Sequence, residues 1–309
     1  MLRYLVSRLL IAIVAIFVLV TLTFFLLRAI PGDPLAAPRL TQEVKERLRE
    51  HYGLDKPQIE QYAIYMDNLL HGDLGWSLMS RGRRVNAVIA EAFPVSLDLG
   101  IRAMIFAIAF GLLFGIAAAL NRGRSLDYLT VVLAIVGVSV PSFVVAGVLQ
   151  YWLGVYLKVL PVARYEGFWH TIMPSFALGI GTMAIIARYM RSSMLEIVNA
   201  DYIRTARAKG LRPAQIVWRH QMRNALFPIL TILGPTTAAV LTGSFVIESI
   251  FAIPGLGRYF VLGMQNLDYT LVLGLTVFFG ALLIAMNFLV DIAYGLIDPR
   301  IRHAQPAPK

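Results

Sequence analysis

The sequence predicts an all-α integral membrane protein with six transmembrane helices and a helical extracytoplasmic insertion between the first two helices. Hydrophobic residues make up 58% of the 309 residues and charged residues only 15%, with a mean hydropathy of +0.69. A soluble domain of this size carries about a quarter charged residues. The charged residues here lie mostly in short segments between six uncharged runs, each long enough to form a helix that crosses a bilayer.

The six uncharged runs define the predicted spans, which are residues 9–27, 103–120, 128–157, 171–187, 224–247 and 269–290. The third run is longer than a bilayer requires, so we expect that helix to tilt or to extend beyond the lipid on one side. Pro174 lies near the start of the fourth run, where a helix tolerates proline. The first run is too long for a signal peptide and no small-residue cleavage site follows it, so we interpret it as an uncleaved helix.

The basic residues predict the orientation of the spans. One side of the predicted topology has a clear excess of them: Arg3, Arg8, Arg122, Arg124, the basic segment 188–228, Arg300, Arg302 and Lys309. The short connections on the other side contain only Lys158, Arg164 and Arg258. By the positive-inside rule, both termini are expected in the cytoplasm and segment 31–94 outside. The net charge of +10 therefore indicates membrane topology, and we expect no nucleic acid as a partner.

This topology divides the chain into four parts. They are an N-terminal part with the first helix (1–30), the extracytoplasmic insertion (31–94), a transmembrane core (95–295) and a cytoplasmic tail (296–309). In the insertion, capping residues and helically spaced apolar residues predict two short amphipathic helices, one from Thr41 to Gly53 and one beginning at Pro57. A solvated linker is the alternative for this segment.

The cytoplasmic loop 188–228 of the core carries a helix–glycine–helix pattern. Ser192 and Ser193 resemble a helix cap, and a helix is predicted through Asp201 as far as Gly210, which can adopt the left-handed conformation that stops a helix. Pro213 then opens a further short helix. Such an element suits the transmission of force to a soluble partner, and small side chains would let that partner approach closely, namely Thr205, Ala206 and Ala208. The alternative is an ordinary solvated basic loop.

Several kinds of catalytic or cofactor site are absent from the sequence. There is no Walker phosphate-binding motif and no Gly-Lys dipeptide, so the chain is not expected to bind ATP by such a loop of its own. The motifs H-E-x-x-H and G-x-S-x-G are missing, there is no cysteine, and the five histidines are scattered. Glycines in segment 251–268 are interpreted as part of a re-entrant or interfacial turn and not as a phosphate site. We therefore expect no enzyme, no metal site and no cofactor on this chain.

The segment 201–211 (DYIRTARAKGL) resembles the coupling loop of permease subunits from binding-protein-dependent ABC importers, in the oligopeptide/dipeptide/nickel branch. Such loops generally read E-A-A-x-x-x-G, whereas Arg204 and Thr205 occupy the first two positions here, before Ala206 and Gly210. The contacts of the family's glutamate are therefore not transferred. Similar blocks follow in order along nearly the whole chain: MLRYLVSRLL at residue 1, PGDP at 31, HGDLG at 71, VPSF at 140, TGSFVIE at 242 and DPRI at 298.

The wording of VPSF and TGSFVIE is most similar to the first permease subunit of oligopeptide importers, although dipeptide, glutathione and nickel permeases share most of this scaffold. The resemblance implies the type I ABC importer fold in a bacterial plasma (inner) membrane. It also implies a second homologous permease, two ATP-binding subunits that hold ATP and Mg²⁺, an extracytoplasmic solute-binding protein and a peptide substrate. The residues expected to couple to the ATPase are Asp201, Tyr202, Arg204, Thr205, Ala206, Lys209 and Gly210.

Polar residues near the predicted membrane boundary are candidates for the substrate path: Arg28, Asp98, Arg102, Pro141 and Glu248. Charges close to hydrocarbon are costly, so they tend to pair or to face a polar cavity. Asp98 and Arg102 are spaced i,i+4 and are expected to share one helix face. We hypothesise that Arg28 and Glu248 lie near the external mouth, where they hold a gate shut or meet peptide termini. The alternative is that each side chain snorkels to the headgroups.

Two other classes of function compete with an ABC permease. An ion-coupled secondary transporter would show paired acids or a broken helix near mid-membrane, together with internal repeats, and the sequence reveals neither. A membrane-embedded enzyme would need a catalytic constellation, which cannot be assembled from these residues. The sequence therefore favours a translocation subunit that obtains its energy from another chain.

Overall fold

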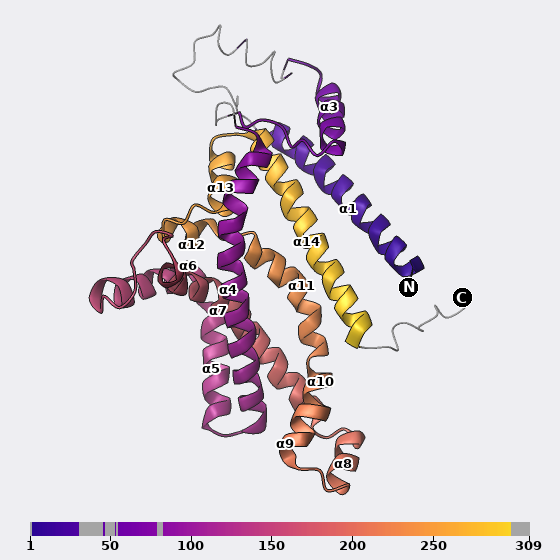
Figure 1. Ribbon diagram of the computed structural model, residues 1–309, viewed down its shortest axis with the longest axis vertical. Helices are drawn as coiled ribbons and strands as arrows, with labels where there is room; N and C mark the ends of the chain where they lie inside the picture. The colour runs from indigo at the N-terminus through magenta and orange to yellow at the C-terminus, as the bar shows by residue number, and fades with distance from the viewer. Residues whose placement is uncertain (1, 31–45, 47–52, 54, 79–82, 298–309) are drawn as a thin grey trace. The chain divides into compact units, whose positions relative to one another are not determined.

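The computed structural model describes residues 2–30, 46, 53, 55–78 and 83–297 (Figure 1). Among these residues the regular structure is helical, and the β pairing found there is a single isolated bridge between Trp76 and Arg84. The prediction of an all-α protein is confirmed. The predicted helix beginning at Thr41 and nearly all of the tail 296–309 lie outside the described residues.

Five helical segments of the described chain are long and apolar enough to cross a membrane: Leu9–Ala29, Val85–Leu120, Phe168–Ile197, Phe227–Ile250 and Tyr269–Val290. They belong to α1 (Leu2–Ala29), α4 (Val85–Leu120), α7 (Phe168–Ile197), α11 (Phe227–Leu241) with α12 (Phe245–Ile250), and α14 (Tyr269–Ile297). Each contains or overlaps one of the predicted uncharged runs. The first, second, fourth, fifth and sixth predicted spans are thereby confirmed as helical, span-length segments.

The third predicted span is not one helix. It consists of α5 (Ser125–Ser139), followed by α6 (Ser142–Leu149) and a π-helical segment (Gln150–Tyr156), and the two halves are bent by 104°. Val140 between them is extended, with ψ of 121°. This is the conformation expected before Pro141, because the proline ring clashes with a helical residue on its N-terminal side. The prediction of one continuous helix over residues 128–157, tilted or extending beyond the lipid, was wrong in its continuity.

Two helices extend further than their uncharged runs. α4 begins at Val85 and α7 continues to Ile197, because paired or surface charges do not end a helix. As a result Ser192 and Ser193 lie inside α7, and the prediction that they cap a new helix was wrong. Within segment 251–268, which was interpreted as a turn, residues Leu256–Gln265 form the helix α13.

The chain divides into two compact units. Unit 1 comprises Met1–Val95 and Gly255–Ile284, and unit 2 comprises Ser96–Pro254 and Ala285–Lys309. In unit 1, α1 contributes Val20, Phe24 and Leu27 to a buried cluster with Tyr65 of α3 (Gln58–Leu70) and with residues of α14. Thr21 and Tyr62 also share a hydrogen bond of 2.7 Å, so α3 is fixed on α1. The predicted helix after Pro57 is confirmed.

The core of unit 2 forms between α4 and α7. Ala107 of α4 packs with Met183, Ile186 and Met190 of α7 in one buried cluster. Glycines bring the two helices close together, since a Cβ at Gly111 would lie 2.8 Å from Ile186 and one at Gly115 would lie 2.6 Å from Met190. Small residues at such crossings are how membrane helices gain close packing. This packed pair supports the loop that follows α7.

Candidate coupling site and polar clusters

The predicted coupling helix is present as α8 (Asp201–Ala208), and it begins shortly after the end of α7 at Ile197. The chain turns after α8 at Gly210. The φ of Gly210 is +75°, a left-handed conformation that favours glycine. α9 (Pro213–Ile216) follows at once, and Figure 1 shows α8 and α9 side by side. The helix–glycine–helix prediction is confirmed as local structure.

One face of α8 is anchored within the chain. Ile203 is completely buried and Ala206 is 4% exposed, and both pack against Ile216 of α9. The small side chain of Ala206 therefore allows α8 to pack closely on α9. From the sequence alone, this small side chain was instead assigned to the approach of a partner protein. Because α8 has only eight residues, this cluster and not backbone propensity alone must hold it in place.

The opposite face of α8 is solvent-exposed and polar. The exposed side chains are Asp201, Tyr202, Arg204, Thr205, Arg207 and Lys209. Arg204 lies 3.6 Å from Asp201, and the Thr205 hydroxyl donates to the Asp201 carbonyl at 3.0 Å. The Tyr202 hydroxyl accepts a hydrogen bond of 2.9 Å from Asn224 in α10 (Met222–Ala225), which ties the helix to the chain that enters α11. The exposed face is thus a defined surface on a fixed element.

Asp98 and Arg102 form the ion pair that their spacing predicts. The Arg102 Nε lies 2.9 Å from both Asp98 carboxylate oxygens, and the Tyr165 hydroxyl donates to the same carboxylate at 2.9 Å. Burial raises the pKa of Tyr165, and its hydrogen bond to Asp98 raises it further, so the phenol stays a neutral donor. The Arg102 guanidinium lies 5.3 Å from the ring centroid of Phe168. The cluster fastens the segment before α7 onto α4.

Glu248 lies fully buried in α12 and accepts a hydrogen bond of 2.9 Å from the Ser96 hydroxyl of α4. The chain reaches α12 through Gly243, which is left-handed with φ of +82°. α12 packs against α6 and α7. Pro141 directly precedes α6. It therefore sets the direction in which α6 leaves the bend, and α6 is one of the helices that pack against α12.

Hydrogen bonds to backbone carbonyl oxygens connect the broken third span and the segment after it to the end of α12. The Gln150 side-chain amide donates to the Ile250 carbonyl at 3.0 Å and to the Val162 carbonyl at 2.9 Å. The Arg164 amide donates to the Phe251 carbonyl at 2.8 Å. Ends of helices inside a membrane need such partners for their polar backbone groups. The bend at Pro141 is therefore a supported part of the fold of unit 2.

Arg28 belongs to unit 1, and its guanidinium is held there. It donates to the Gln61 side chain of α3 from Nη2 at 2.8 Å and from Nε at 3.1 Å, and it lies 3.5 Å from the centroid of the Phe24 ring. Glu248 belongs to unit 2. Each of the charged candidates in the predicted substrate path thus has a partner within its own unit.

Sequence reasoning missed a second ion pair in unit 2. Asp127 in the first turn of α5 is 4% exposed, and Arg191 of α7 donates to its two oxygens at 2.5 and 3.0 Å. The Gly123 amide adds a hydrogen bond of 2.9 Å to the carboxylate. A usable signal was present, because Asp127 directly precedes the third uncharged run and Arg191 follows the fourth. The pair joins the ends of two helices that run in opposite directions.

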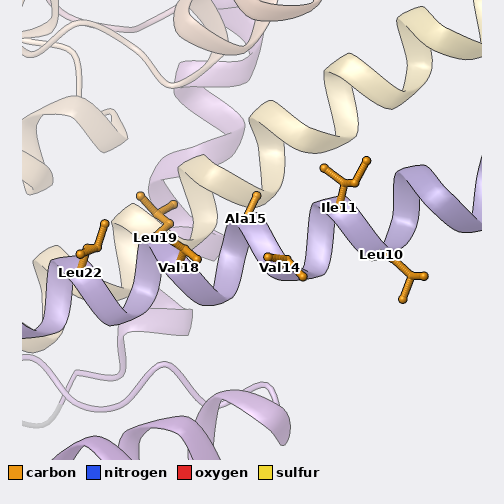
Figure 2. Close-up of a pocket in the computed structure, with 7 residues that line it drawn as sticks. All are labelled: Leu10, Ile11, Val14, Ala15, Val18, Leu19 and Leu22. Atoms are coloured by element: carbon orange, nitrogen blue, oxygen red, sulfur yellow. The ribbon is translucent and has the colours of Figure 1, made fainter.

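A hollow along α1 is lined entirely by apolar side chains. Its lining residues all come from that helix: Leu10, Ile11, Val14, Ala15, Val18, Leu19 and Leu22 (Figure 2). Leu19 also meets Gly280 of α14, where an added Cβ would lie 2.5 Å away. Such a surface suits hydrocarbon and not a peptide backbone. Across the described residues there is also no group of three or more acidic, histidine or cysteine residues that would hold a metal.

Comparison with known families agrees with this geometry. The sequence model described as "Binding-protein-dependent transport system inner membrane component" matches residues 111–303, and the corresponding N-terminal model matches residues 1–100. The chain belongs to this family. It is accordingly a multi-pass permease of the bacterial inner membrane.

Curated relatives are similar to this permease over nearly its full length. "Dipeptide transport system permease protein DppB" of Bacillus subtilis is 46% identical over 98% of both chains. "Oligopeptide transport system permease protein OppB" is 44% identical in Haemophilus influenzae and 42% identical in Escherichia coli K12, over 98% of this chain and 100% of each relative. The resemblance drawn from the sequence blocks is confirmed.

The fold comparison gives a more distant match. A solved amino acid ABC transporter with histidines is 16% identical, with a TM-score of 0.50 over 70% of this chain and 94% of that chain. At this identity the match supports the permease fold alone.

Proposed function

We propose that this permease is the transmembrane subunit of an ATP-driven ABC importer that translocates oligopeptides delivered by an extracytoplasmic binding protein. The observation that carries the proposal is the similarity to OppB and DppB permeases along the entire chain. The complex would contain a second homologous permease and two ATPase subunits, and ATP and Mg²⁺ would be held by the ATPases. A dipeptide is the second candidate substrate, because the Bacillus subtilis relative is named for dipeptide transport.

The exposed face of α8 is the proposed contact with an ATPase subunit. Asp201, Tyr202, Arg204, Thr205 and Lys209 would form the contact surface. Ala206 would keep α8 seated on α9, and Gly210 would permit the turn between them. Movement of the ATPase would be passed to α7 and to α10, because α8 begins four residues after the end of α7 and is hydrogen-bonded to α10. This arrangement supports coupling and leaves the energy source on another chain.

The proposed substrate path in unit 2 passes the clusters that contain Asp98, Arg102, Pro141 and Glu248. The side chains of Asp98, Arg102 and Glu248 are paired or hydrogen-bonded within the chain. These interactions would define the walls of the path, and a peptide would not meet unpaired charges of these residues. Arg28 would instead fix α3 on α1 at the end of the first span. A broken span also occurs in secondary transporters, but the similarity of the whole chain to ABC permeases favours an ABC importer.

Uptake assays test the proposed function directly. The gene and its neighbours would be expressed in a strain that lacks its own peptide importers, and uptake of labelled tripeptides to pentapeptides and of dipeptides would be measured. We expect uptake to require the binding protein and ATP and to persist after the proton gradient is collapsed by an uncoupler. Uptake that stops with the gradient but continues without the ATPase subunits would show a secondary transporter instead.

The first prediction concerns orientation, with both termini proposed in the cytoplasm. The chain has no cysteine, so single cysteines are unambiguous reporters. We expect Lys56→Cys to react with a membrane-impermeant maleimide in intact cells, and Arg207→Cys to react only after permeabilisation, since both side chains are exposed. Labelling of Arg207→Cys in intact cells would reverse the proposed topology.

A second prediction concerns Glu248. Glu248→Gln keeps an oxygen that accepts from the Ser96 hydroxyl but replaces the buried carboxyl group by an amide that cannot ionise, so the fold should persist while the balance between transporter states changes. We expect altered peptide uptake or a raised basal ATPase rate in the assembled complex. Glu60→Gln is the matched control, because Glu60 is an exposed residue paired with Lys56. Equal uptake by both variants, for peptides of different charge, would exclude Glu248 from the transport path.

A further inference from the structure

A groove of about 320 Å³ runs between α5 and α7 in unit 2. Its walls combine aliphatic residues of α5 with two arginines of α7: Val131, Ala134, Ile135, Val138, Arg188 and Arg191. Ile135 and Val138 remain 59% and 49% exposed. The groove therefore has an open apolar side and a cationic side, a combination that neither the proposed peptide path nor the coupling helix uses.

The charges and the apolar wall lie in different stretches of the groove. Asp127 near the start of α5 meets Arg191, whereas Gly137 near its end lies close to Ala184, where an added Cβ would be 2.9 Å away. The two helices are thus antiparallel along the groove. Arg188 and Arg191 lie toward the first turns of α5, and Ile135 and Val138 lie toward its end. A ligand that fits both stretches must have a charged head and an apolar tail.

The cationic end favours a negative headgroup. Arg191 directs Nε and Nη2 to Asp127, which compensates one charge. Arg188 is exposed and has no ion pair or hydrogen bond with any described residue, so its charge is not compensated in this way. Arg122 and Arg124 lie in the turn that precedes α5, at the same end of that helix. This end of the groove therefore carries a net positive charge.

We propose that the groove binds an anionic phospholipid of the surrounding bilayer. The phosphate lies against Arg188 and Arg191, and one acyl chain lies along Val131, Ile135 and Val138. Basic pockets between transmembrane helices recognise anionic headgroups in this way, and hydrocarbon fills the aliphatic wall. Asp127 holds Arg191 in place, so the site is formed before the lipid arrives. The proposal does not depend on the identity of the transported substrate.

Native mass spectrometry of the full-length chain in mild detergent tests the site. The probes are dioleoyl phosphatidylglycerol and dioleoyl phosphatidylcholine, each added at the same concentration. We expect the unmodified chain to retain phosphatidylglycerol in preference to phosphatidylcholine. Equal retention of the two lipids would overturn the proposal.

Two pairs of variants separate the headgroup contact from the acyl contact. Arg188→Gln should weaken retention of phosphatidylglycerol about fivefold, which is the effect of one basic side chain at an anionic lipid surface, while Arg219→Gln, an exposed arginine outside the groove, should not change it. Val138→Trp should fill the apolar stretch and reduce retention of phosphatidylglycerol, while Val132→Trp, on another exposed position of α5, should not. Unchanged retention in both groove variants would overturn the site.

A last arm distinguishes lipid from protein as the occupant. Val138→Cys would be labelled with maleimide in membranes that contain this chain alone and in membranes that contain the whole transporter. We expect equal labelling in both, and labelling slowed by added phosphatidylglycerol in detergent. Protection that appears only when the second permease is present would identify the groove as a subunit interface and overturn the lipid site.

Discussion

Replacing Ala206 by glutamate should reduce transport-linked ATP hydrolysis to near the background rate. The new carboxylate would enter the cluster of Ile203 and Ile216, where the Ala206 position is only 4% exposed. Burying an unpaired charge costs several kcal/mol, so α8 would leave α9 and lose its place in the loop. The measurement is peptide-stimulated ATPase activity of the reconstituted complex, together with co-purification of the ATPase subunits.

The control for this prediction is Ala208→Glu on the exposed side of the same helix. It introduces the same charge and the same change in helix propensity, but it leaves the buried cluster of Ile203, Ala206 and Ile216 unchanged. Both variants should enter the membrane and elute as folded protein on size exclusion, because the transmembrane core is not altered. Full activity of Ala206→Glu would show that α8 does not need its anchor on α9, and the assignment of this loop would fail.

Replacing Gly243 by alanine should destabilise unit 2 more than the conformational cost of a left-handed alanine explains. That cost is about 1–2 kcal/mol. In addition, the new methyl group would collide with the Glu248 carboxylate and would lie 3.1 Å from the Ser96 hydroxyl. Glu248 is fully buried, so it has little room to move away. Thermal unfolding of the purified chain in detergent measures the effect.

Gly123 supplies a closely matched control for the Gly243 prediction. Its φ is +75°, near the +82° of Gly243, and a Cβ there would meet nothing within 4 Å. Gly123→Ala should therefore show the conformational cost alone. The changes Gly243→Ala and Glu248→Ala should also be non-additive, because the second removes the group that the first would strike. Equal unfolding temperatures for Gly243→Ala and Gly123→Ala would contradict the collision.

The membrane helices could largely be predicted because a bilayer imposes a strong and simple constraint. A run of residues without charge must either cross the lipid or be buried, so residues 9–27 and 269–290 were easy to place. The helix–glycine–helix geometry of the cytoplasmic loop could also be predicted, because Gly210 ends one helix and Pro213 begins the next through local backbone effects. The pairing of Asp98 with Arg102 followed from helical spacing alone. In each case the deciding feature lies within one short stretch of the sequence.

The features that were missed depend on contacts between distant residues. Pro141 is compatible with a kinked or a broken helix, and the outcome here is supported by Gln150 reaching the Ile250 carbonyl. Ser192 has the chemistry of a cap but lies inside α7. Ala206 is small enough to admit either a partner or a neighbouring helix of its own chain. Spacing within one segment contains no information on which of these alternatives packs better.

The 104° bend at Pro141 has a consequence for biogenesis. The machinery that inserts nascent chains selects segments by length and hydrophobicity, and residues 128–157 meet both criteria as one stretch. In the folded protein, however, α5 alone has 15 residues, fewer than the roughly 20 that cross the hydrocarbon. The stretch that is inserted is therefore longer than the helix that remains straight. The bend itself is local to Pro141, but the hydrogen bond from Gln150 to the Ile250 carbonyl can form only after α12 has been synthesised. The complete set of hydrogen bonds around this bend is therefore available only after residue 250 has been synthesised.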